Sequence, residues 1–233
     1  MPTAWQAVDY AGIPVGGSVA VFGLGPIGQM CCRIAAHPGA GQVIGIDLVP
    51  ERLALAARYG VTAIDARAEK DLPDAVREMT GGRGADSVID AVGMEAHGAP
   101  LGRLAHQMVG LLPDQFAARL MEKGGVDRLA VLHQAIATVR RGGTISLSGV
   151  YGGMLDPLPM MELFDKQIQL RMGQANVRLW IDDVLPLVAG DADPLGVEDL
   201  ATHKLPLSEA PNAYRMFQQK QDGAIKILLQ PAA

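Results

Sequence analysis

Residues 19–28 read VAVFGLGPIG, and this stretch decides the fold that the chain is expected to adopt. An apolar run ends in three glycines with the spacing Gly-X-Gly-X-X-Gly, and Asp47 follows the last of them by 19 residues. Such a pattern is typical of a dinucleotide-binding unit, in which a strand, a tight turn and a helix precede a second strand that ends in an acidic residue. The sequence therefore predicts a doubly wound parallel sheet with a nucleotide site at the carboxyl ends of its strands.

Each residue type in this motif has a physical role in such a site. Gly23 permits a tight turn after the strand, Gly25 leaves the backbone open to a pyrophosphate, and Gly28 lets the following helix pack close to the sheet. Pro26 and Ile27 stand at the start of that helix, whose free N–H groups and positive end attract phosphate. These five residues form the predicted pyrophosphate site.

Asp47 is the predicted contact to the adenosine ribose. Its carboxylate can accept hydrogen bonds from both ribose hydroxyls and would repel a 2′-phosphate, so NAD is expected to bind better than NADP. Arg52 is close enough in sequence to offset part of that repulsion. The alternative role for Asp47 is a helix cap, but Pro50 is the expected first helical residue, which places the cap at Val49.

The composition excludes some classes of partner. The 233-residue chain has a net charge of −5, and its longest basic run is Arg140-Arg141. Neither nucleic acid nor an anionic membrane is expected to bind it. Residues 1–15 lack the basic start of a targeting signal, and no apolar stretch reaches the ~18 residues of a membrane span, so a cytoplasmic protein is expected.

Strand-like and helix-like runs alternate along the chain, as they do in βαβ units with a parallel sheet. The six expected strands are residues 18–22, 42–47, 61–64, 86–90, 144–147 and 167–171. The helices expected between them include residues 29–36, 50–59 and 127–141. The predicted fold class is therefore α/β, with a doubly wound six-stranded parallel sheet of the Rossmann type within residues 1–175.

The sixth strand is expected at an edge of the sheet. Polar residues alternate with apolar ones along residues 167–172, whereas a fully covered central strand is apolar on both faces. An exposed edge can pair with another chain. The hypothesis is a homo-oligomer, a dimer in which this segment joins two sheets.

Two regions exceed a minimal doubly wound domain. Residues 94–126 follow the fourth strand with helix-like spacing, and they are expected either to cover the adenosine half of the site or to pack against the sheet. Residues 176–233 form a C-terminal tail with expected helices at 179–189 and 208–219 and a short strand at 224–229. That strand has no obvious partner in the main sheet.

The sequence predicts no metal site. Cys31 and Cys32 are adjacent, so they point in different directions on a helix, and buried thiols are expected. The five histidines show no paired ligand spacing; they are His37, His97, His106, His133 and His203. No catalytic residue is assigned either.

Short motifs along nearly the whole chain resemble one protein family. Beyond residues 23–28, they are Asp47 with Arg52, Asp90-Ala91-Val92-Gly93, Gly142-Gly143-Thr144, THKLPL at 202–207 and Ala224-Ile225-Lys226. Together they are similar to the zinc-containing medium-chain alcohol dehydrogenases. The insertion after Gly93 resembles that of the branch with glutathione-independent formaldehyde dehydrogenase and formaldehyde dismutase.

The resemblance implies further cofactor contacts. Asp47 and Arg52 would hold the adenosine ribose of NAD. Val92, Gly149 and Val150 would line the nicotinamide half of the site.

The resemblance also bears on the C-terminal tail. Lys226 matches a basic position that reaches the pyrophosphate in the family, and the alternative is a solvated lysine at the end of a strand. In the family the last segment returns to pack on a second, catalytic domain, which would explain the unpartnered strand and a separate segment 176–233.

In the family, a preceding N-terminal domain carries the zinc ligands and the proton relay. This chain opens at Pro2-Thr3-Ala4-Trp5, which resembles the family sequence just beyond those ligands. Hydride transfer needs a Lewis acid or a base at the alcohol hydroxyl. The expected function is therefore the NAD-binding part of a zinc-dependent alcohol or aldehyde dehydrogenase, with little or no turnover by this chain alone.

Two other functions remain open at this point. A nonenzymatic NAD-sensing module and an S-adenosylmethionine-dependent methyltransferase both combine a glycine-rich turn with an acidic residue. Sensing modules tend to lack the tail after Arg178. A methyl donor carries no pyrophosphate, so it would gain less from the helix that starts at Pro26.

Overall fold

The computed structural model describes residues 1–37, 39–92, 129–151, 158–190 and 192–231. The predicted insertion at residues 94–126 lies outside these ranges. The two roles expected of it, covering the cofactor or packing against the sheet, therefore stay predictions.

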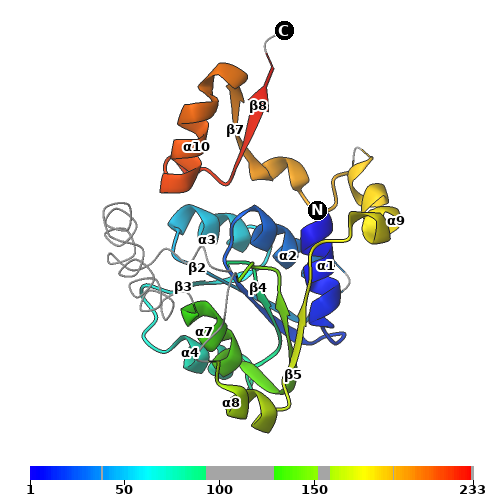
Figure 1. Ribbon diagram of the computed structural model, residues 1–233, viewed down its shortest axis with the longest axis vertical. Helices are drawn as coiled ribbons and strands as arrows, with labels where there is room; N and C mark the ends of the chain where they lie inside the picture. Colours follow the sequence, from blue (N-terminus) through cyan, green and yellow to red (C-terminus); the bar gives the residue numbers. More distant parts are fainter. Residues whose placement is uncertain (38, 93–128, 152–157, 191, 232–233) are drawn as a thin grey trace, which may run out of the picture.

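The described residues form a parallel six-stranded sheet with the order β3-β2-β1-β4-β5-β6 (Figure 1). The strands are β1 (Ser18–Phe22), β2 (Gln42–Asp47), β3 (Thr62–Asp65), β4 (Ala85–Asp90), β5 (Val139–Leu147) and β6 (Gln169–Met172). The order in which the chain adds strands to the sheet reverses between β1 and β4, as it does in the Rossmann fold. The predicted fold class is confirmed, and β6 lies at the edge of this sheet.

Several boundaries differ from the expected ones, and three of these differences have a local reason. The helix expected at 127–141 ends at Thr138, because Val139 already pairs with Ala85 as the first residue of β5. The register then shifts before Ser87, which opposes Thr144. Strand β6 starts late because Gln167 has a positive φ of 55° in the turn that precedes it.

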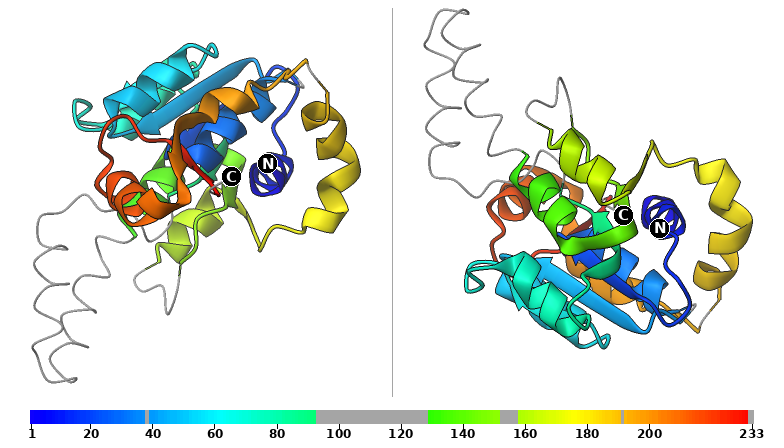
Figure 2. Two further views of the ribbon diagram at one scale, coloured as in Figure 1. Left: turned by 90° about the horizontal axis from the view of Figure 1, so that it is seen from above. Right: turned by 90° about the horizontal axis from the view of Figure 1, so that it is seen from below.

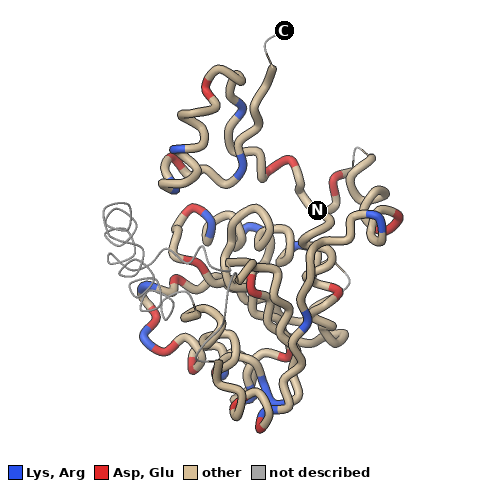
Figure 3. The backbone as a smooth tube through the Cα atoms, viewed as in Figure 1, with Lys and Arg blue, Asp and Glu red and all other residues tan. Residues whose placement is uncertain are grey.

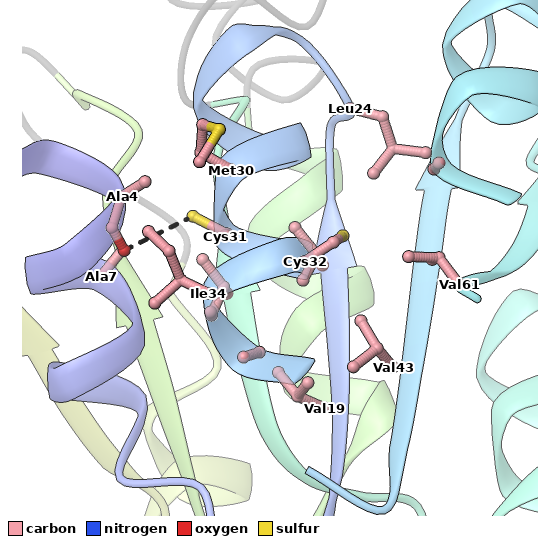
Figure 4. Close-up of a cluster of buried hydrophobic side chains, with 14 of the residues drawn as sticks. Ala4, Ala7, Val19, Leu24, Met30, Cys31, Cys32, Ile34, Val43 and Val61 are labelled. Carbon is pink, nitrogen blue, oxygen red and sulfur yellow. Dashed lines mark hydrogen bonds between the residues drawn. The ribbon is translucent and has the colours of Figure 1, made fainter. Parts of the chain in front are cut away.

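Helices cover both faces of the sheet. One face carries α1 (Pro2–Ala11), α2 (Pro26–Ala36) and α3 (Pro50–Ala57), whose buried side chains form one core cluster (Figure 4). The other face carries α4 (Leu72–Met79), α7 (Ala130–Thr138) and α8 (Met160–Asp165), with a second cluster. In β1, Val19 and Val21 belong to the first cluster, whereas Ala20 and Phe22 belong to the second. This alternation is the period of two expected for a strand that is buried on both sides.

Helix α1 was not anticipated from the sequence. It begins with Pro2 in its first turn and ends at Gly12, which adopts the left-handed conformation at φ 55°. Gln6 is buried in this helix and donates from Nε2 to the carbonyls of Gly173 (3.2 Å) and Gln174 (3.0 Å), while its Oε1 accepts from Trp180 Nε1 (3.0 Å). Helix α1 therefore connects the end of β6 to the C-terminal tail.

The tail forms a small lobe with its own sheet. It contains α9 (Val177–Val188), the 3-10 turns η2 (Val197–Leu200) and η3 (Leu207–Glu209), β7 (Ala201–Pro206), α10 (Ala210–Gln219) and β8 (Lys226–Gln230). Strand β8 pairs in parallel with β7, and both lie apart from the main sheet together with α10 (Figure 1), whereas α9 lies beside α1 (Figure 2). The partner of the last strand is therefore β7, which was not predicted as a strand.

A buried arginine fastens this tail to the main domain. Arg33 in α2 donates from Nη1 to the carbonyls of Leu195 (3.1 Å) and Gly196, and its guanidinium lies 3.6 Å above the centre of the Tyr59 ring. The Tyr59 hydroxyl donates in turn to Asp199 at 2.5 Å. These contacts fix the start of the β7–β8 lobe relative to α2 and α3.

Charges are distributed in both signs along the described chain (Figure 3). Several meet as surface pairs, among them Arg141 with Asp165 at 2.7 Å and Arg77 with Asp74 at 2.6 Å. No helix within the described ranges is long and apolar enough to cross a bilayer.

Candidate dinucleotide site

The predicted site lies where the strand order reverses, at the carboxyl ends of β1 and β4. Phe22 ends β1 and stands beside Asp90, which ends β4. Gly23 follows directly, and its N–H donates to the carbonyl of Ile46 in β2 at 2.8 Å. Open α/β sheets bind their ligands in the crevice at such a switch point.

Gly23 and Gly28 are held at positions that a side chain could not occupy. Gly23 has a φ of 84°, and a Cβ there would lie 2.6 Å from Cγ2 of Val92. A Cβ at Gly28 would lie only 1.7 Å from the carbonyl oxygen of Gly23. The helix α2 thus packs against the turn in direct backbone contact, and only glycine allows this approach.

Gly25 differs from the other two glycines of the motif because a Cβ there would collide with nothing. It caps α2 at φ −66°, and the nearest atom to a Cβ there is Nη1 of Arg52 at 3.8 Å. Pro26 is the first helical residue, and Ile27 is 40% exposed. The first N–H groups of a helix have no partner within the helix, so this end can receive an anion without displacing a side chain.

Both carboxylate oxygens of Asp47 accept hydrogen bonds from the backbone. Oδ2 accepts from the backbone N–H of Leu24 at 2.6 Å, and Oδ1 accepts from Leu48 (2.6 Å) and Val49 (2.9 Å). Val49 is the cap of α3, as Pro50 indicated. Arg52 Nη1 lies 3.5 Å from Asp47 Oδ2, so the two residues assigned to the ribose are adjacent.

Gln29 braces this adenosine half and was missed by sequence reasoning. Its side chain is fully buried, and Nε2 donates to the carbonyls of Leu24 (3.2 Å) and Arg52 (2.7 Å). The glycine turn and the start of α3 are therefore tied to each other by Gln29 and by the bond from Leu24 to Asp47. A glutamine among the apolar residues of the first turns of α2 is the signal that could have indicated this role.

The residues assigned to the nicotinamide half gather around Asp90. The N–H of Val92 donates to Asp90 Oδ1 at 2.9 Å, and the N–H of Gly149 donates to the Asp90 carbonyl at 2.8 Å. Val150 follows with 79% of its surface exposed. The hydroxyl of Tyr151 donates to Asp90 Oδ2. Burial and the charge of Asp90 raise the pKa of Tyr151 far above its usual value, so this hydroxyl stays protonated and remains a donor.

Lys226 lies across a cavity from the start of α2. The cavity has a volume of about 340 Å³, and its lining includes Pro26, Ile27, Lys204 and Lys226. The structure therefore brings the helix start and two lysines of the β7–β8 lobe to one cavity. Lys204 was not singled out from the sequence as a site residue.

The described ranges contain no group of three or more histidine, cysteine or acidic side chains that could hold a metal. Cys31 and Cys32 are buried, and Cys31 Sγ lies 3.8 Å from the carbonyl oxygen of Ala4 (Figure 4). Burial raises the pKa of Cys31 to about 12 and also raises that of Cys32, so both thiols stay protonated. These residues do not fit a zinc ion. His97 and His106 lie outside the described residues.

Comparisons with known proteins agree with this fold. The family model described as zinc-binding dehydrogenase matches residues 26–101. The chain is 35% identical over 99% of its length to the uncharacterized zinc-type alcohol dehydrogenase-like protein AdhB of Bacillus subtilis (strain 168), of which it covers 57%. Formaldehyde dismutase of Pseudomonas putida is 28% identical over 94% of the chain and 53% of its own length.

Among solved structures, alcohol dehydrogenase TADH from Thermus sp. ATN1 matches with a TM-score of 0.78 and 34% identity, covering 99% of this chain and 57% of that one. The chain thus spans about half the length of the curated relatives it matches. The similarity to formaldehyde dismutase agrees with the branch that the sequence indicated. Over the part of those proteins that it spans, the chain is therefore similar in sequence and fold to zinc-type alcohol dehydrogenases.

Proposed function

We propose that this chain is the NAD-binding part of a zinc-dependent alcohol or aldehyde dehydrogenase, which transfers hydride between its substrate and NAD. One observation carries the proposal. At the switch point of the sheet, Gly23 and Gly28 bring α2 into backbone contact with the turn, while Gly25 leaves the helix start open. A pyrophosphate fits this arrangement, because backbone N–H groups and the helix dipole can bind it without a basic side chain.

Asp47 supports NAD over NADP as the cofactor. Its carboxylate ends β2 beside the glycine turn, where it can accept bonds from ribose hydroxyls and would repel a 2′-phosphate. Arg52 lies 3.5 Å away and weakens that repulsion without removing it. Lys226 would approach the pyrophosphate from the β7–β8 lobe, and Val92, Gly149 and Val150 would line the nicotinamide half.

The chemistry is divided between this chain and a zinc-bearing part that its described residues do not supply. NAD carries the hydride when it is bound, and the residues of this chain hold and orient it. We propose that this chain alone binds NAD with little or no turnover. In the whole protein, residues 1–175 would form the cofactor domain, and residues 176–233 would pack on the catalytic domain.

We also propose that two copies associate through the edge strand β6, which pairs on one side with β5. Several apolar side chains near this edge are exposed, among them Met172 (58%) and Phe164 (80%). An unpaired strand edge with apolar neighbours favours pairing with another chain. We also propose that the protein is located in the cytoplasm.

Calorimetric titration of the chain with NAD, NADP and S-adenosylmethionine tests the cofactor assignment. NAD is expected to bind more tightly than NADP, and Asp47→Ala should reduce the affinity for NAD while narrowing the difference from NADP. Asp74→Ala, which changes an exposed carboxylate on α4, is the matched control and should leave both affinities unchanged. Binding of S-adenosylmethionine in place of NAD would contradict the proposal.

A further inference from the structure

Asp90 stands outside the predicted cofactor contacts, yet it joins the segments around the nicotinamide half. It ends β4 at the switch point, and its side chain is fully buried. Burial of a carboxylate costs free energy unless hydrogen bonds compensate it. The bonds that compensate it here come from two different loops.

Both oxygens of the Asp90 carboxylate are used. Oδ1 accepts from the N–H of Val92, in the loop after β4, at 2.9 Å. Oδ2 accepts from the hydroxyl of Tyr151, in the loop after β5. The Asp90 carbonyl oxygen accepts from the N–H groups of Ser148 (2.9 Å) and Gly149 (2.8 Å). A single residue therefore sets the position of both loops relative to each other.

The position of Val92 matters to the glycine turn as well. Its Cγ2 fills the space beside Gly23, only 2.6 Å from where a Cβ would stand. Val92 therefore packs on the side of the glycine turn that faces the loop after β4. The adenosine half, in contrast, is held by separate contacts, from Leu24 to Asp47 and from Gln29 to Arg52.

We infer that Asp90 and Tyr151 form a positioning pair that shapes the nicotinamide half of the site and leaves the adenosine half unaffected. The inference rests on the proposed function, since it concerns the same cofactor. Tyr151 acts through Asp90, which in turn holds Val92 and Gly149. Neither member of the pair needs to touch the ligand.

The variant Tyr151→Phe tests this inference, because it removes one hydroxyl and keeps the ring that packs against the core. NAD and ADP-ribose are titrated against the wild type and the variant. The affinity for NAD should fall about tenfold, because the loops that line the nicotinamide half are no longer held in the binding arrangement, while that for ADP-ribose should stay within about twofold. Tyr214→Phe, on an exposed side chain of the C-terminal lobe, should change neither.

A second measurement in the free protein follows the loops themselves. Amide hydrogen exchange at Val92 and Gly149 should be faster in Tyr151→Phe than in the wild type, with exchange at Leu24 unchanged. A variant that keeps the wild-type NAD affinity overturns the inference. So does a variant that loses ADP-ribose equally, because the pair would then support the fold as a whole.

Failure of the proposed function gives a different result. In that case the wild type binds neither NAD nor ADP-ribose, and the inference falls with it. A wild type that binds NAD no more tightly than ADP-ribose leaves the proposed cofactor in place but overturns the positioning role, because the nicotinamide half would then contribute no affinity.

Discussion

At the scale of single residues, the three glycines of the motif divide into two kinds. Gly23 and Gly28 are required by the fold, since a Cβ at either position would collide with other atoms of the chain. Gly25 meets no such obstacle, with the nearest atom 3.8 Å from a Cβ. The motif and the separate roles of its glycines could be predicted from the sequence, but the contacts behind them could not, because Val92 and the Gly23 carbonyl are brought to these positions by the fold.

The substitution Gly28→Ala should therefore destabilise the whole domain. The new methyl group would overlap the Gly23 carbonyl, and relieving such overpacking costs about 1–3 kcal/mol. Urea denaturation measures this change in the free energy of unfolding. Gly190→Ala is the matched control, because a Cβ there meets nothing within 4 Å, and equal stabilities of the two variants would refute the packing role.

The substitution Gly25→Ala should affect the ligand and spare the fold. Alanine fits the backbone at φ −66° and the free space, so the free energy of unfolding should change by less than about 1 kcal/mol. The methyl group would block the approach of a pyrophosphate, and the affinity for NAD should fall at least about tenfold. A variant that binds NAD as well as the wild type would place the pyrophosphate elsewhere.

At the scale of elements, the strands with strong apolar runs could be predicted closely, and β1 and β2 begin and end where expected. The start of β5 could not, because it depends on the pairing of Val139 with Ala85 across the sheet. Strand β7 alternates exposed and half-buried residues, and among the described residues it pairs with β8 alone. Its extended conformation therefore depends on β8, which the local sequence does not reveal. Helix α1 likewise depends on Gln6, whose partners lie more than 160 residues away.

One cluster connects the ends of three strands opposite the site. Asp86 in β4 accepts from the N–H and the hydroxyl of Ser18 in β1, both at 2.9 Å, and from Arg140 Nε in β5 at 2.6 Å. Burial alone would favour the neutral acid, but these bonds hold the pKa of Asp86 below its ordinary value. The charged form therefore stabilises the folded state above the unfolded pKa near 3.9, and this contribution is lost as pH falls through the lower folded pKa.

Asp86→Asn should accordingly reduce stability in a pH-dependent way. At pH 7 the loss is expected to be about 1–3 kcal/mol, since partly buried hydrogen bonds to a charged group are weakened. The difference between variant and wild type should shrink as pH falls below about 4. Urea denaturation at both pH values checks this, with the exposed Asp182→Asn as control; a difference that does not depend on pH would refute the ionic role of Asp86.

At the scale of the whole molecule, the sheet predicted from the sequence is present, and a second, smaller sheet carries Lys226 to the cavity at the start of α2. The sequence pattern could not place this lobe, because its attachment depends on Arg33 and Tyr59 meeting residues 195–199. The glycine motif, Asp47 and Arg52 lie in one neighbourhood of the fold. The supporting residues Gln29 and Tyr151 belong to no sequence motif, and the motif that begins at Asp90 does not indicate its role, since these roles come from tertiary contacts.

The proposed association through β6 predicts a dimer in solution. Met172→Lys would place a charge on the exposed edge of this strand and should shift the population towards monomer. Met79→Lys on α4, where the side chain is 41% exposed, should leave the mass unchanged. Sedimentation velocity over a range of concentrations measures both, and a wild type that is monomeric throughout would rule out this interface.

A crystal structure of the chain with NAD would show where the cofactor lies on the sheet. We expect the pyrophosphate against the backbone of Gly25 and the start of α2, the adenosine ribose on Asp47, and the nicotinamide beside Val92 and Gly149. NAD bound away from the carboxyl ends of β1 and β4, or crystals that take up no NAD at saturating concentration, would contradict this expectation.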